Sequence, residues 1–193
     1  HANGVAGVAF SPDGTLLAGE TAGAIRRFAA RDGRWSELPR WKTSATIVTS
    51  LAVSPDGRHV AVGFLDDSDS PQSTRVPTVE VLDAATGQSA KTWRFAQIGV
   101  GNLRTVAWSA DGSRLAFSQN TDRERAHAWV VQRDGTELRN LTARLSERGA
   151  AWPALSPDGR KLLWIADRRG RMPIIVTDVD SGDSKTVTAV NGS

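Results

Sequence analysis

A four-residue turn sequence recurs four times along the chain and constrains its fold more than any other feature. Three copies read Ser-Pro-Asp-Gly and one reads Ser-Ala-Asp-Gly; they begin at Ser11, Ser54, Ser109 and Ser156. Each copy lies between two short apolar runs, and successive copies start 43, 55 and 47 residues apart. A period of about 45 residues with a turn inside each unit indicates a propeller or a related repeat array.

Each residue of the repeated turn has a conformational role. Proline sets φ for the first central position, aspartate is tolerated at the second, and glycine adopts the positive φ that follows. Because β-rich runs flank every copy, each predicts a hairpin with a type I turn and a glycine bulge. The serine hydroxyl is expected to cap the turn by bonding backbone N–H groups two residues on. The residues interpreted as structural in these turns are Asp13, Gly14, Asp56, Gly57, Asp111, Gly112, Asp158 and Gly159.

The remaining turn signals divide each repeat into four strands. The chain is therefore predicted to be all-β, a single β-propeller array over residues 1–193 built from four-stranded antiparallel blades. The four blades are expected at about 4–43, 48–95, 104–142 and 150–190. In the third blade the last strand is predicted over Glu137–Thr142.

The fourth repeat shows a family resemblance most clearly, in the segments 140–142, 151–164 and 174–182. These segments resemble the WD40-like (PD40) repeats of TolB-type β-propellers, which also occur in the non-catalytic propellers of prolyl-oligopeptidase-family peptidases. The shared pattern covers almost the whole chain but lacks the Gly-His and Trp-Asp dipeptides of true WD40 repeats. The resemblance implies the fold far more than a function. It also favours a periplasmic or secreted location, which the residues themselves do not identify.

Four blades are few, because propellers have typically four to eight and a blade cannot bury its faces alone. Three arrangements remain open: a closed four-bladed ring, a ring of eight blades made by two chains, or part of a larger propeller. Small inner-strand residues such as Ala9, Ala52, Ala107 and Ala154 suit the first. In an open arc the first and last blades would each expose an apolar face, so self-association or further blades from a longer parent chain is the expectation.

The composition excludes several kinds of chemistry. Without cysteine the chain has no disulfide, thiolate nucleophile or Cys-ligated zinc, and its three histidines are scattered. No Gly-x-Ser-x-Gly nucleophile elbow is present. The net charge of +3 contains no run of five like charges, which argues against nucleic acid as a partner. No apolar stretch reaches the roughly 18–20 residues of a membrane span. We therefore expect no catalytic residues, no cofactor and no enzymatic activity.

Two clusters are the candidates for ligand binding. Asp66, Asp67 and Asp69 place several carboxylates on one loop and are candidate ligands for a metal ion, Ca²⁺ above all. A solvated acidic loop is the favoured interpretation. Loops that join the second strand to the third, and one blade to the next, should share one face. In blades three and four these loops have an excess of arginines that could bind an acidic peptide or another anionic partner, the alternative being a solvated surface. These arginines are Arg104, Arg123, Arg125, Arg144, Arg148, Arg168, Arg169 and Arg171.

The tryptophans divide by strand position. Trp108, Trp129, Trp152 and Trp164 are predicted to lie between blades, whereas Trp35, Trp41 and Trp93 lie on outer strands. An exposed ring there could stack on a sugar or seat a partner, but core or rim packing is the favoured interpretation. The sequence thus favours a non-enzymatic propeller scaffold that mediates protein–protein interaction. The alternatives are the gating propeller of a prolyl-oligopeptidase-type peptidase and a carbohydrate-binding propeller.

Overall fold

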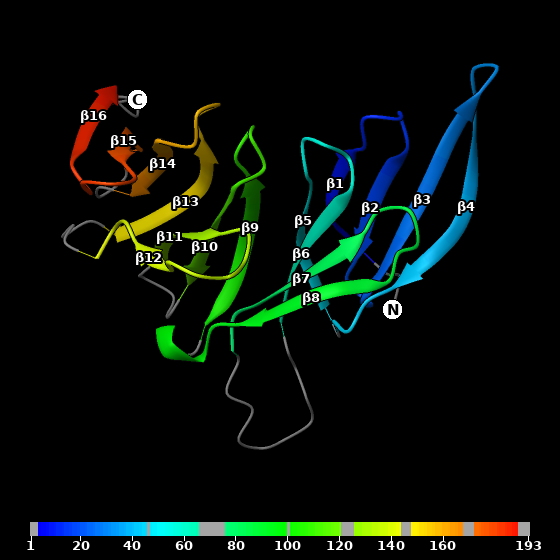
Figure 1. The fold of residues 1–193 in the computed structure, drawn as a ribbon, viewed down its shortest axis with the longest axis horizontal. Coiled ribbons are helices and arrows are strands. Elements are labelled where there is room, and N and C mark those ends of the chain that lie inside the picture. The colour runs from blue at the N-terminus through cyan, green and yellow to red at the C-terminus, as the bar shows by residue number, and fades with distance from the viewer. Residues whose placement is uncertain are drawn as a thin grey trace. The chain divides into compact units, whose positions relative to one another are not determined.

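The computed structural model describes residues 4–45, 47–65, 76–99, 101–120, 126–143, 148–167 and 172–188. It contains four four-stranded antiparallel sheets, each formed by strands consecutive in the chain (Figure 1). Blade 1 is β1 (Val5–Phe10), β2 (Leu16–Glu20), β3 (Ala24–Arg31) and β4 (Arg34–Lys42); blade 2 is β5 (Ile47–Val53), β6 (His59–Leu65), β7 (Thr78–Asp83) and β8 (Ser89–Arg94). Blade 3 is β9 (Asn102–Trp108), β10 (Arg114–Asn120), β11 (Ala126–Gln132) and β12 (Arg139–Asn140); blade 4 is β13 (Arg148–Leu155), β14 (Lys161–Asp167), β15 (Ile174–Asp178) and β16 (Ser184–Thr188). One short 3₁₀ turn, η1 (Ala96–Ile98), follows blade 2. The all-β prediction of four-stranded blades is confirmed.

The repeated tetrapeptide connects the first two strands of every blade. In all four copies the glycine N–H donates to the serine carbonyl at 2.8–2.9 Å, and the glycine φ lies between +67° and +84°. A positive φ strains any residue with a Cβ, so glycine suits this position.

The chain forms two compact units, His1–Leu103 and Arg104–Ser193. In the first unit, Leu17, Ile25 and Trp41 of blade 1 pack against Val48 and Val60 of blade 2. In the second unit, Ala116, Ala128 and Val130 of blade 3 pack against Leu162, Trp164 and Ile175 of blade 4. Each pair of blades therefore has its own hydrophobic core.

The last strand of blade 3 is much shorter than the predicted Glu137–Thr142. Glu137 has a φ of +52°, which is outside the β region, and β12 therefore begins only at Arg139. At the other end the Asn140 side chain accepts a hydrogen bond from the Thr142 N–H at 2.9 Å. This local asparagine turn competes with strand pairing and ends β12 after two residues.

The tryptophan prediction was wrong at one position, Trp152, and the favoured packing of Trp41 and Trp93 is confirmed. Trp41 and Trp93 lie on outer strands but are buried, because Trp41 pairs with Ile25 and Trp93 with Val79, both buried residues. Trp152 is 59% exposed, since a register shift between Ala151 and Ala154 and a φ of +50° at Trp152 interrupt the alternation of β13.

The other tryptophans follow the prediction more closely. Trp164 is buried and Trp35 is exposed, while Trp108 and Trp129 are half-buried. Within the described residues, no helix is long and apolar enough to cross a membrane.

Candidate functional site

The turn aspartates are held by their own turns. Asp56 Oδ1 accepts the Ser54 hydroxyl at 2.5 Å and the Arg58 N–H at 3.0 Å, and Asp111 and Asp158 make the same two contacts within their turns. The proposed role of serine needs correction, since the aspartate and not the serine bonds the N–H two residues on. The Ser54 hydroxyl instead accepts the His59 N–H at 2.9 Å, five residues away.

The first turn is one residue shorter than the other three. There the Ser11 N–H bonds the carbonyl of Thr15, four residues on, whereas Ser54, Ser109 and Ser156 bond a carbonyl five residues on. The strand register is kept, because Phe10 pairs with Leu16 as Val53 pairs with Val60. Thr15 consequently stands where blade 3 has Arg114.

Hydrogen bonding lowers the pKa of three of the turn carboxylates. The pKa of Asp111 is lowered first by the Ser109 hydroxyl, and the pKa values of Asp13 and Asp158 are lowered in the same way by Ser11 and Ser156. No group of three or more His, Asp or Glu residues in the described part of the chain could hold a metal ion. The candidate metal residues Asp66, Asp67 and Asp69 lie outside the described residues.

Most of the predicted arginine surface also falls outside the described residues. Arg104 is exposed on β9, and Arg148 begins β13 without a described side chain. The positions outside the described residues are Arg123, Arg125, Arg144, Arg168, Arg169 and Arg171. The arginine surface therefore stays a prediction.

The apolar face expected on the first blade covers the side of blade 1 opposite to its contact with blade 2. We call it the outer face of blade 1; it comprises Val8, Phe10, Leu16, Phe28 and Trp35. Phe10 pairs with Leu16 and Leu16 with Phe28 across three strands, so these side chains share one face. Phe10 is 62% exposed and Trp35 53% exposed, with 6.2 Å between their ring centroids. Exposed apolar patches of this kind mark interaction surfaces.

A network of ion pairs borders this apolar surface. Arg26 binds Glu37 through two N–H···O contacts, from Nε to Oε1 at 3.0 Å and from a terminal nitrogen to Oε2 at 2.8 Å, and its guanidinium lies 4.9 Å from the Phe28 ring centroid. Arg40 Nε also donates to Glu37 Oε1, at 3.1 Å, and Arg40 reaches Glu20 at 3.4 Å. A two-point contact between guanidinium and carboxylate is among the strongest hydrogen-bonded pairs in proteins.

The network makes stability depend on the ionisation of Glu37. Hydrogen bonds, that from Arg26 first, lower the pKa of Glu37 from 4.5 to about 2. A depressed pKa contributes stability above the unfolded-state value, and this contribution is lost as the pH falls towards the folded-state value. Relative to Glu37→Gln, the native chain is therefore expected to lose melting temperature between pH 4.5 and about 2. Circular dichroism measures the melting temperatures of both chains. The same dependence of melting temperature on pH in the two chains would contradict this.

Blade 4 also has an apolar face directed away from its neighbour. Leu163 pairs with Val176 and Ile165 with Ile174, and these residues alternate with the buried Trp164 and Ile175. Leu163 is 40% exposed. Blades 1 and 4 are therefore both apolar on two faces, as expected of blades that have a neighbour on each side.

Comparisons with known proteins agree with this architecture. The family model described as "WD domain, G-beta repeat" matches residues 1–26 and 36–69. Among solved structures, hydrazine synthase of Kuenenia stuttgartiensis matches with a TM-score of 0.69 at 14% identity, over 93% of this chain and 52% of that one. The chain thus spans about half the length of that structure. No curated protein matches. The repeats are WD40-like propeller repeats, and a likeness at this identity concerns the fold alone.

Proposed function

We propose that the chain is a non-enzymatic, TolB-type propeller scaffold that binds other proteins. The observation that supports this best is the outer face of blade 1, where exposed apolar rings are bordered by ion pairs. WD40-like repeats favour the same kind of role. A turnover of ester, peptide or glycoside substrates that copurifies with the chain would contradict the non-enzymatic part.

The occupant we propose for the outer face of blade 1 is another propeller blade. The support comes from blade 4, whose free face is apolar as well and would complement it. The neighbouring blade would come from a second copy of the chain or from further sequence of a longer protein. Burying apolar surface stabilises by roughly 25 cal/mol per Å², so such pairing is favourable.

Light scattering on the chain and its variants tests this proposal. The molar mass of the native chain in solution is expected to exceed the monomer mass of 20.6 kDa. Phe10→Asp or Trp35→Asp is expected to lower the measured mass towards that of the monomer. Ser36→Asp is the matched control, because Ser36 neighbours Trp35 but pairs with Ala29 on the opposite face. A native chain that remains monomeric at every concentration would contradict pairing between two copies, and a control that dissociates equally would contradict the role of the outer face of blade 1.

The gating propeller of a peptidase stays an alternative through the resemblance alone. The carbohydrate-binding alternative is weakened, because Trp41 and Trp93 are buried and only Trp35 of its three candidate tryptophans is exposed.

A further inference from the structure

A cavity of about 200 Å³ opens between blades 1 and 2, at the ends of their Ser-Pro-Asp-Gly turns. Its lining includes the apolar residues Leu17, Val60 and Ala84, together with Trp41 and Arg27. The remaining lining residues come from the two turns: Ser11, Pro12, Asp13, Thr15, Asp56 and Gly57. At about 30 Å³ for one water molecule, the cavity has room for a single polar side chain with its aliphatic stem.

Arg27 has unused hydrogen-bonding capacity in this cavity. Its guanidinium lies 4.2 Å from the Trp41 ring centroid, and one terminal nitrogen contacts the Pro39 carbonyl at 3.4 Å. Its Nε is buried and has no hydrogen-bond partner among the described residues. Burial lowers the pKa of Arg27, and the charge of Asp13 opposes that shift. A buried donor without an acceptor is costly, so Nε is a candidate for contact with a ligand.

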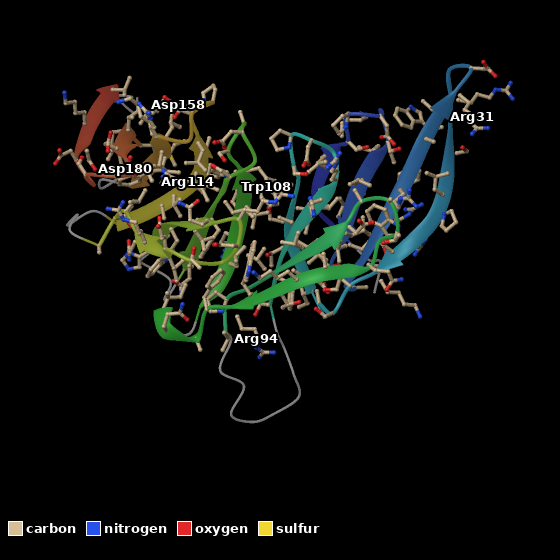
Figure 2. All side chains as sticks on the ribbon, in the orientation of Figure 1. Arg31, Arg94, Trp108, Arg114, Asp158 and Asp180 are labelled. Carbon is tan, nitrogen blue, oxygen red and sulfur yellow. The ribbon has the colours of Figure 1, made fainter. Side chains whose placement is uncertain are left out.

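The corresponding gap between blades 3 and 4 is closed by the protein's own side chains. Arg114 and Asp180 come from neighbouring blades (Figure 2) and lie 3.4 Å apart. Arg114 also donates to the Gly159 carbonyl at 3.0 Å, and Arg139 donates to the Asp180 carbonyl at 2.7 Å. Only about 10 Å³ remains there.

Two substitutions within the repeat open the gap between blades 1 and 2, and a third changes its lining. Because the first turn is one residue shorter, Thr15 of blade 1 stands at the position that Arg114 has in blade 3. Ala85 of blade 2 stands at the position that Asp180 has in blade 4, because each lies two residues after the aspartate of its turn, Asp83 or Asp178. The register further puts Arg27 where blade 3 has the buried Val130, since Leu17 pairs with Arg27 as Ala116 pairs with Val130. The propeller fold alone does not require an arginine at that position.

The polar groups of the cavity define the chemistry of its ligand. Arg27 Nε requires an acceptor, while the carboxylates of Asp13 and Asp56 favour a donor. A carboxylate ligand would be repelled by the two aspartates, and an ammonium group would leave Nε unpaired. We infer that the cavity binds a carboxamide, the side chain of an asparagine or glutamine presented by a partner protein. The source of the group rests on the proposed role in protein binding.

Titration of the whole chain with N-acetyl-L-glutamine N-methylamide, followed by ¹⁵N NMR, tests the inference. Saturable shifts are expected at the Arg27 Nε–H and the Trp41 indole N–H. The glutamate analogue is expected to bind about tenfold more weakly or worse, because its charge faces both aspartates. Arg27→Lys, which lacks Nε, should abolish the shift of the Trp41 indole. Arg114→Lys, in the closed gap, should leave binding unchanged.

A second variant keeps the test independent of any loss of folding in Arg27→Lys. Thr15→Arg restores the arginine of the closed gap and is expected to block the cavity with Arg27 in place. Absence of saturable shifts, equal binding of the glutamate analogue, or unchanged binding by Thr15→Arg would each overturn the inference. None of these results depends on the light-scattering outcome, so the cavity and the outer face of blade 1 are tested separately.

Discussion

Gly87→Ala is expected to destabilise the first unit by about 2–5 kcal/mol, combining left-handed strain with overpacking. Gly87 has a φ of +71°, and a Cβ added there would lie 2.2 Å from Trp41 Cδ1. The turn holds Gly87 in place through its N–H, which donates to the Asp83 carbonyl at 2.8 Å. Trp41 in turn stacks on Arg27, so it has little room to move aside.

The chain contains a matched control for this prediction. Gly182 occupies the equivalent turn of blade 4, with a φ of +79° and the same bond to the Asp178 carbonyl at 2.9 Å, but a Cβ there would meet nothing within 4 Å. Gly182→Ala should therefore cost only the strain, about 1–2 kcal/mol. Urea unfolding followed by tryptophan fluorescence would measure both variants. Equal losses would show that the contact with Trp41 adds nothing.

Trp164→Ala is expected to destabilise the second unit by about 3–5 kcal/mol, as for other large core truncations. Trp164 is 1% exposed in the core between blades 3 and 4, and its indole N–H donates to Thr177 Oγ1 at 2.9 Å. Trp164→Phe should recover part of the loss by refilling the cavity without the hydrogen bond.

Trp152→Ala in the same sheet is the control. Its side chain is largely exposed, and exposed substitutions usually change stability by about 0.5 kcal/mol or less. Thermal melts of the three variants should rank Trp164→Ala lowest and Trp152→Ala closest to the native chain. Similar melting temperatures for the two alanine variants would contradict the different burial of the two tryptophans.

The strands could be predicted because their signals are local. The tetrapeptide fixes a hairpin through its own φ preferences, and in every blade it connects the first two strands, as predicted. Predictions that needed the register across strands were less successful. Trp152 was predicted to lie between blades, but the register shift between Ala151 and Ala154 leaves its ring exposed.

The candidate sites were harder to predict for the same reason. An apolar outer face on blade 1 was expected from the repeat architecture, but the residues that form it were not; Val8 and Phe10, which alternate with small residues on β1, are the local signal for them. The cavity beside Arg27 gave no such signal. The cavity depends on Thr15 and Arg27 of blade 1 and on Ala85 of blade 2, which are far apart in sequence.

The shortened first turn has a consequence for how such arrays diversify. Deleting one residue inside a strand would move every following side chain to the other face of the sheet. Deletion inside the turn leaves the pairing of Phe10 with Leu16 intact and changes only the side chain at the rim of the gap. Descendants of one ancestral repeat could therefore acquire or lose a binding pocket by a single-codon deletion or insertion after Gly14, Gly57, Gly112 or Gly159, with the sheet itself unchanged.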